Sequence, residues 1–319
     1  MLKIDAHMHV NFNGFTVEDI IQYLDTNGID RCWLMSWEEL NPVIPKYYKD
    51  LPIENVMEAY EKYPERIIPL YAPDPRRNDL SDQIEIYIER GIRGYGEVKV
   101  PLRWDSTEIE SLLLLLQKHK LPILFHMQGM KSYYIPKSNN PLEYVLDELM
   151  NEGLNGIPRK FLFMLMNKVT FLKRRLSENL VQFPGYMLDF ESLEQQLTKF
   201  PTIDFIGHGP YFWRNIAHSF DMDLNFDRGH IKKKGRIWRL MESYDNLHAD
   251  ISGKSGYNAL TRDTKFAKLF MEKFYKKILF GTDNFFIGLE EYIMNLGLPS
   301  YKLKRIFASN AEELISFKN

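Results

Sequence analysis

The amino-acid sequence predicts an α/β protein built on one closed barrel of eight parallel strands. Eight short runs are rich in apolar and β-branched residues, as expected for strands buried on both faces. Amphipathic helical stretches lie between most of these runs, so strands and helices alternate. Several runs end in a histidine or a carboxylate, which would gather polar side chains on one rim of the barrel.

The predicted strands recur along the whole chain. They are Lys3–His9, Asp30–Trp37, Arg66–Pro75, Ile92–Val100, Pro122–Met127, Asp204–Gly209, Asn246–Gly253 and Lys277–Asn284. Eight alternating units imply a parallel sheet, and eight is the number that closes a (β/α)8 TIM barrel. No linker divides the chain, so we expect a single domain over residues 1–319.

The helices between the strands have recognisable ends. The first is expected over Thr16–Asn27, with a threonine cap at its start and Gly28 after its end. The helix expected over Ser106–His119 has acidic residues in its first turn, which favours a helix start there. The remaining expected helices are Ile53–Tyr63, Leu80–Arg90, Ser106–His119, Leu260–Phe274 and Ser309–Phe317.

Two long connections interrupt the alternation. The fifth and sixth strands are separated by an insertion of about residues 131–200, which we expect to be helical and which includes the basic, Met-rich stretch Phe161–Arg175. Such a helix could bind a membrane surface or a partner protein, or it could simply pack its apolar face on the protein and expose its basic face to solvent. Because the insertion follows a strand, it must rise from the catalytic rim. We predict a helical lid that supplies substrate contacts or the subunit interface of a homo-oligomer. The second long loop is 210–236.

Composition excludes several classes of protein. The 41 basic and 43 acidic residues give a net charge of −2, which offers no electrostatic basis for binding nucleic acid or an anionic membrane. Cys32 is the only cysteine, so no intrachain disulfide can form and a reducing, cytoplasmic setting is expected. The N-terminus shows no signal-peptide pattern, and the apolar run 112–116 is too short to span a bilayer.

The polar residues at the strand ends predict a metal site. His7 and His9 are two positions apart on the first strand, so both imidazoles point to the same face and could bind one ion. Further strands contribute one such residue each to the same rim, namely Glu97, His126, His208 and Asp283. Histidine and carboxylate are ligands for zinc and similar ions.

These residues carry a family resemblance that spans the chain in order. The segments Ile4–His9, Leu124–His126, Ile206–Gly209, Phe280–Asp283 and Ala308–Ala311 resemble the amidohydrolase superfamily. Within it, they resemble the amidohydrolase-related branch that includes the aminocarboxymuconate semialdehyde decarboxylase-like proteins. The resemblance implies a (β/α)8 barrel whose metal is bound by His7, His9, His126 and Asp283. His208 would be a second-metal ligand or an acid/base group beside the metal.

The chemistry of such a site follows from its groups. A metal with an open position lowers the pKa of a bound water from ~15.7 towards ~7. Asp283 is suited to accept the proton of that water and pass it to a leaving group, and His208 could stabilise an oxyanion or relay a proton. Asp5 lies deeper on the face of His7 and either orients a ligand or bonds within the strand.

Glu97 and Lys99 leave the number of metal ions open. They share one face of the fourth strand, so both point into the barrel mouth or both into the helix layer. In the superfamily that the chain resembles, a carboxylate or carboxylated lysine on this strand marks binuclear members. Glu97 could bridge two ions, Lys99 could do so after carboxylation, or either could support the strand or face substrate. We expect zinc, as one or two ions, with a weak preference for two.

The rim also suggests a small-molecule substrate. Trp37, Arg103, Tyr211 and Trp213 follow strand ends and are the candidate substrate-binding residues. An aromatic and basic rim suits a planar or carboxylate-bearing molecule, although each aromatic could equally pack beneath the long insertions. The sequence thus predicts a metal-dependent hydrolase acting on an amide, ester or lactone. A nonoxidative decarboxylase on the same metal site is the close alternative, and a non-catalytic binding barrel is a third.

Overall fold

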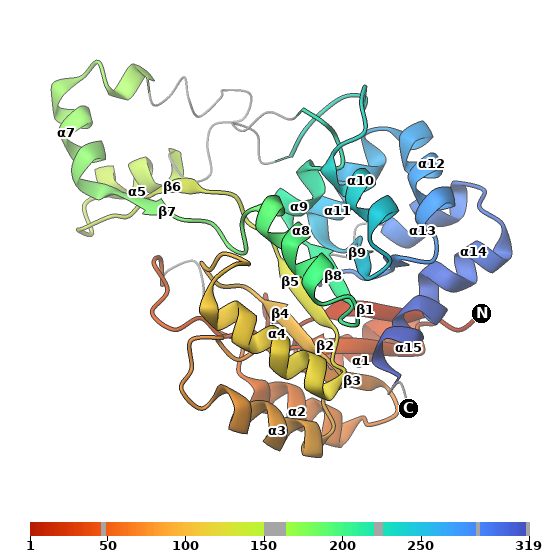
Figure 1. Ribbon diagram of the computed structural model, residues 1–319. Helices are drawn as coiled ribbons and strands as arrows, with labels where there is room; N and C mark the ends of the chain where they lie inside the picture. The colour runs from red at the N-terminus through yellow and green to blue at the C-terminus, as the bar shows by residue number, and fades with distance from the viewer. Residues whose placement is uncertain (46–48, 150–163, 220–225, 285–287, 317–319) are drawn as a thin grey trace.

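The chain folds into a closed barrel of eight parallel strands, as the computed structural model shows (Figure 1). The structure describes residues 1–45, 49–149, 164–219, 226–284 and 288–316. One sheet has the order β1-β2-β3 and the other β10-β9-β8-β5-β4. The bounds are β1 (Ile4–Met8), β2 (Arg31–Met35), β3 (Ile67–Leu70), β4 (Tyr95–Val98), β5 (Ile123–His126), β8 (Phe205–His208), β9 (Leu247–Asp250) and β10 (Ile278–Leu279).

Backbone hydrogen bonds join the two sheets at both seams. The amide of Ala6 donates to Phe280 O at 2.8 Å, which links β1 to the end of β10. The amide of Arg93 donates to Pro69 O at 2.9 Å, which links β3 to the start of β4. The predicted (β/α)8 barrel is therefore confirmed, and each predicted strand contains an observed one.

The helices begin and end close to the predicted residues in the first half of the chain. Thr16 caps α1 through a capping box with Asp19, and Gly28 ends it in the left-handed conformation at φ 58°. Ser106 caps α4 by accepting from the amide of Ile109. These helices are α1 (Val17–Asn27), α2 (Ile53–Lys62), α3 (Leu80–Arg90) and α4 (Thr107–His119).

The second half departs from the prediction at several places. The helix expected over Leu260–Phe274 ends as predicted but begins later, at Thr264, because Asp263 caps it there by accepting from the amide of Phe266, and residues 260–261 belong to the preceding helix. The last expected helix begins earlier, in a π-helical turn, and its final residue lies outside the described residues. The elements here are α9 (Pro210–Arg214), α10 (Arg236–Ser243), α11 (Gly253–Thr261), α12 (Thr264–Phe274), α13 (Leu289–Asn295), α14 (Ser300–Lys304), η2 (Arg305–Ser309) and α15 (Asn310–Ile315). Of these, α10, α13 and α14 were not predicted.

The insertion after β5 contains both helices and strands. An antiparallel pair, β6 (Lys131–Tyr134) with β7 (Leu180–Phe183), forms its base, and α5 (Pro141–Asp147) and α7 (Thr170–Asn179) stand beside the barrel (Figure 1). The β6–β7 pair was not predicted. Residues 161–163 of the expected basic helix lie outside the described residues. Within the predicted 131–200 segment, α8 (Phe190–Lys199) packs into the main core with the barrel helices.

The core has separate parts for the barrel and the insertion. The main cluster lies between strands and helices, and a smaller one includes Leu124 and Ile206, two residues before His126 and His208 on the same strands. Residues two apart share a face, so these apolar side chains lie one layer beneath the polar rim. The insertion has its own clusters around Tyr134 and Phe183. Among the described residues, no helix is both long and apolar enough to cross a membrane.

Candidate metal centre

Residues from five strand ends converge on one buried cluster. His7 Nε2 lies 3.0 Å from His9 Nε2 and 3.6 Å from Asp283 Oδ1. His208 Nε2 lies 3.7 Å from Asp283 Oδ2 and 3.8 Å from Glu97 Oε1. The four side chains other than Asp283 are almost inaccessible to solvent, whereas that of Asp283 is 19% exposed. The convergence predicted from the sequence is thus present in the structure.

Glu97 lies between two sets of imidazoles. Its Oε2 is 3.5 Å from His9 Nε2, and its Oε1 is 2.7 Å from His126 Nδ1. The same Oε1 is 3.9 Å from His7 Nε2 and 3.8 Å from His208 Nε2. Glu97 therefore belongs to two possible ligand groups, one with His7 and His9 and one with His126 and His208. A third group joins His7, His208 and Asp283.

Local irregularities of the strands help to aim these side chains. The register of β1 with β2 shifts between Asp5 and Met8, and that of β4 with β5 shifts between Tyr95 and Val98. A β-bulge interrupts the alternation of side chains and re-aims those near it. On a regular strand, Ala6 and His7 would point to opposite faces of the sheet. Here Ala6 packs into the apolar interior of the barrel, and its neighbour His7 nevertheless joins the polar cluster.

Outer contacts fix which ring nitrogen faces the cluster. His9 Nδ1 lies 2.9 Å from the carbonyl oxygen of Met35. A carbonyl only accepts, so Nδ1 carries the proton and Nε2 presents its lone pair to the cluster. Asp250 engages the Nδ1 atoms of two rings at once, with Oδ2 at 2.5 Å from His7 Nδ1 and 3.1 Å from His208 Nδ1, so that the Nε2 atoms of both rings face the cluster. Ser252 Oγ also lies 3.1 Å from His208 Nδ1 and donates to Asp250.

Asp5 and Asn284 hold the backbone that carries the histidines. Asp5 accepts from the amides of His7 and Thr282 and from the Thr282 hydroxyl, so it bonds within the strand layer rather than to a ring. Burial raises the pKa of Asp5 to about 7. Asn284 accepts from the amide of His9 and donates to its carbonyl. These bonds clamp the His-x-His segment to the chain after β10.

The electrostatics of the cluster favour ionised carboxylates. Burial is the largest influence on Asp250 and by itself raises its pKa, but the His7 and His208 rings bring that pKa far below its usual range. Burial likewise opposes ionisation of Glu97, and the charges of His126 and Lys99 still hold its pKa well below its usual value. Burial lowers the pKa of His7, yet Asp250, Asp283 and Glu97 together raise it to about 10.

The donor set fits a divalent cation. Imidazole nitrogens and carboxylate oxygens are ligand types of zinc and of other first-row divalent ions. The Nε2 atoms of His7 and His9 are directed at one point, since their Nδ1 atoms are engaged elsewhere. Clustering such polar groups away from water costs free energy unless they are paired or coordinate a metal.

The candidate substrate-binding residues do not all reach this cluster. Trp37 does, because its ring packs edge-on against His9 with centroids 4.7 Å apart. Tyr211 is partly buried and packs near Phe190. Arg103 is exposed and bonds to Asp105 and Asp189.

The structure places Trp213 in the core instead of at the rim. Its indole is 1% exposed, packs against Phe212 and Phe270, and donates to the Asp250 carbonyl at 2.9 Å. The short helix that follows His208 turns this side chain back towards the barrel wall. Trp213 therefore supports the strand end that carries Asp250.

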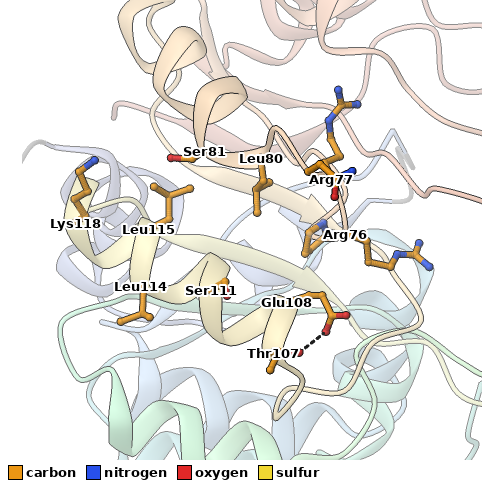
Figure 2. Close-up of a pocket in the computed structure, with 12 residues that line it drawn as sticks. Arg76, Arg77, Leu80, Ser81, Thr107, Glu108, Ser111, Leu114, Leu115 and Lys118 are labelled. Atoms are coloured by element: carbon orange, nitrogen blue, oxygen red, sulfur yellow. Dashed lines mark hydrogen bonds between the residues drawn. The ribbon is translucent and has the colours of Figure 1, made fainter.

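A separate cleft of about 760 Å³ lies between α3 and α4 (Figure 2). Arg76 and Arg77 stand at one end of it and Lys118 at the other. Both arginines are already bound by carboxylates, Arg76 by Asp74 and Arg77 by Asp79 and Glu38. None of the residues that line this cleft belongs to the histidine and carboxylate cluster.

Comparison with known proteins identifies the fold. No family model and no curated protein matches the chain. An uncharacterized TIM-barrel protein from Bordetella bronchiseptica superposes with a TM-score of 0.58 at 14% identity, with 98% of each chain covered. A probable 2-pyrone-4,6-dicarboxylic acid hydrolase from Acinetobacter baumannii superposes with a TM-score of 0.56 at 13% identity, covering 99% of this chain and 100% of that one.

A third solved structure was determined with a metal. The 5-carboxyvanillate decarboxylase from Novosphingobium aromaticivorans, complexed with manganese and 4-hydroxy-3-methoxy-5-nitrobenzoic acid, superposes with a TM-score of 0.54 at 15% identity. The match covers 98% of this chain and 96% of that one. The likeness extends over the full length of these proteins, and the chain has the TIM-barrel fold that they share.

Proposed function

We propose that this chain is a metal-dependent hydrolase of the amidohydrolase superfamily that acts on a small-molecule amide, ester or lactone through a metal-activated water. The proposal rests on the convergence of five side chains, in which each ring nitrogen or carboxylate oxygen lies within 4 Å of another. They are His7, His9, His208, Glu97 and Asp283. Solved structures of the same fold include a probable hydrolase and a decarboxylase with manganese, which supports the class of chemistry.

The residues have distinct roles in this proposal. A bound divalent cation supplies Lewis acidity and lowers the pKa of water towards neutrality. Asp283, the most accessible carboxylate of the cluster, accepts a proton and returns it to the leaving group. His208, whose Nε2 lies 3.7 Å from Asp283 Oδ2, would bind the second ion, or, where a single ion is bound, would stabilise the developing oxyanion or relay the proton. Trp37 and Tyr211 are the proposed substrate contacts.

We further propose two ions, zinc being the expected metal, with Glu97 as their bridge. Its two carboxylate oxygens face different imidazoles, which suits a ligand shared by two cations. His7, His9 and Asp283 would serve one ion, and His126 and His208 the other. Bridging by a carboxylated Lys99 receives less support, because the Lys99 ammonium lies over the Trp37 ring at 4.0 Å from its centroid.

Elemental analysis of the purified protein beside Glu97→Gln tests this proposal. We expect two equivalents of metal in the wild type and about one in the variant, because a neutral amide is a poor bridge between cations. Exposed Glu85, which pairs with Lys118, provides the matched control Glu85→Gln. One equivalent in both proteins would rule out the bridge, and no metal in the wild type would leave the non-catalytic barrel.

The decarboxylase alternative rests on the same ligand set and on the decarboxylase among the structures of this fold. A hydrolase directs its activated water at a carbonyl, whereas a decarboxylase needs a proton donor at the carbon that loses carbon dioxide. Assays of the metal-loaded protein on lactone and ester panels, set beside carbon dioxide release from aromatic acids, separate the two. Carbon dioxide release without hydrolysis would establish the alternative.

A further inference from the structure

Lys99 is a cation at the mouth of the cluster that the proposed reaction does not use. It follows β4 directly and comes two residues after Glu97. Its ammonium lies over the Trp37 ring, which itself packs against His9, so Lys99 stands on the cluster side of the strand. The side chain is only partly buried, so it remains accessible from the mouth.

The Lys99 ammonium is held in place by an aromatic ring. Its Nζ lies 4.0 Å from the centroid of the Trp37 ring. A cation over an indole is attracted by the electron-rich face of the ring. Trp37 is itself fixed, because its indole donates to Lys49 O at 2.9 Å and its backbone pairs with Leu51. The cation is therefore positioned before any ligand arrives.

No carboxylate in the described part of the chain lies within ion-pair distance of Lys99 Nζ. The other basic side chains near this end of the barrel differ, since Arg76, Arg77 and Arg103 each bind one or two carboxylates. Glu97 balances the charge of Lys99 at longer range. Once Glu97 binds a cation, as proposed, its negative charge is taken up there and Lys99 is left as an uncompensated positive charge.

We propose that Lys99, with Trp37 and Phe12 as an aromatic wall, forms a subsite for a substrate carboxylate. Phe12 and Trp37 pack edge to face with centroids 5.4 Å apart, and both rings contact His9. A planar molecule along this wall would place an anionic group at Lys99 and its reacting group at the cluster. The inference rests on the proposed function and adds a substrate class to it, namely small molecules with a carboxylate beside a flat ring.

Calorimetric titration with benzoate and with its neutral isostere benzamide tests this subsite. The proteins are the metal-loaded wild type, Lys99→Met, Lys99→Arg and the control Lys62→Met, whose lysine forms an exposed ion pair with Glu18. We expect Lys99→Met to weaken benzoate binding at least tenfold, and Lys99→Arg and Lys62→Met to stay within about threefold of wild type. Benzamide should bind equally to all four. Each protein's metal content is measured in parallel.

Several results would overturn the subsite. They are unchanged benzoate affinity in Lys99→Met, equal affinity of the wild type for benzoate and benzamide, and no benzoate binding at all. If Lys99→Met does not fold, the comparison of the two probes on the chelated wild type still decides the question, because no metal is then present to attract the carboxylate. Failure of the proposed function looks different, because metal content and turnover would then be absent in the wild type. The chelated wild type should bind benzoate more weakly than the metal-loaded protein, because Glu97 then balances Lys99, but still more tightly than chelated Lys99→Met if Lys99 forms the subsite.

Discussion

At the scale of single residues, Asp250 has an unusual position because one carboxylate oxygen contacts two candidate ligands. Its Oδ2 accepts from His7 and His208, which arise from β1 and β8. Removing the charge while keeping the shape would loosen both rings. We expect Asp250→Asn to weaken metal affinity about 10- to 100-fold, as changes to the outer partners of ligating histidines typically do.

Competition for metal with a chelator of known affinity measures this effect. Ser252→Ala is the matched control, because Ser252 contacts only His208 and Asp250 and leaves the His7 contact intact. We expect its loss to be smaller than that of Asp250→Asn. Equal metal affinity in Asp250→Asn and wild type would show that the two rings need no help from this carboxylate.

The residues that sequence reasoning found and missed differ in the kind of signal they carry. His7, His9, His126, His208 and Glu97 each stand at the end of an apolar run, where strand direction alone places them on the rim. Asp250 also ends a strand, so the same rule could have found it. The burial of Trp213 follows from the turn of α9, which no pattern of residues revealed.

At the scale of elements, the insertion after β5 has a polar core of its own. Glu143 is fully buried and accepts from Tyr134 at 2.7 Å and from Asn179 at 2.8 Å, and it is also bound by Arg175. These residues come from α5, β6 and α7. The apolar cluster around them is separate from that of the barrel. We propose that the chain is one domain from which this insertion can open locally.

Glu143→Ala should open the insertion while the barrel stays folded. Its buried partners would lose their acceptor, which costs roughly 1–3 kcal/mol. Limited proteolysis should then cut within residues 131–183 about 5- to 160-fold faster, since cleavage follows the population of the open form. Exposed Glu148 provides the control Glu148→Ala. Loss of metal together with the faster cleavage would instead show that insertion and barrel unfold as one unit.

The elements that the sequence did not predict are short ones set by tertiary contacts. The β6 strand has only four residues, Lys-Ser-Tyr-Tyr, without the alternation that indicates a half-buried strand. It exists because β7, nearly fifty residues later, pairs with it. The break between α11 and α12 did carry a signal in Asp263, an N-cap residue inside an apolar-periodic stretch.

At the scale of the whole molecule, the barrel brings together strand ends that are far apart in the sequence. His7 and Asp283 come from opposite ends of the chain, yet the amide of Asp283 donates to His7 O at 2.8 Å. Closure of the barrel between β10 and β1 makes this contact. The number and spacing of apolar runs predicted that closure, because eight parallel units have one common way to hide both edges of the sheet.

The same closure should couple metal binding to the stability of the entire barrel. An ion held by residues from β1, β4, β8 and the end of β10 binds the folded chain only. At 100 times its Kd it would stabilise the fold by about 2.7 kcal/mol. For a chain of 319 residues this corresponds to a rise in Tm of about 4 °C.

Thermal unfolding of the wild type with zinc and after chelation measures this shift, with His7→Ala as the variant that lacks a ligand. We expect the chelated wild type to melt about 4 °C per bound ion below the zinc-loaded protein, and His7→Ala to retain the barrel's circular dichroism but to lose the part of the shift that its ion causes. Surface substitution Lys62→Met should keep the full shift, because its ion pair with Glu18 joins exposed side chains. If His7→Ala kept both the full shift and a full complement of metal, the metal would be bound elsewhere. The strand-end cluster would then be stabilised by the hydrogen bonds of Asp250, Asp5 and Asn284 alone.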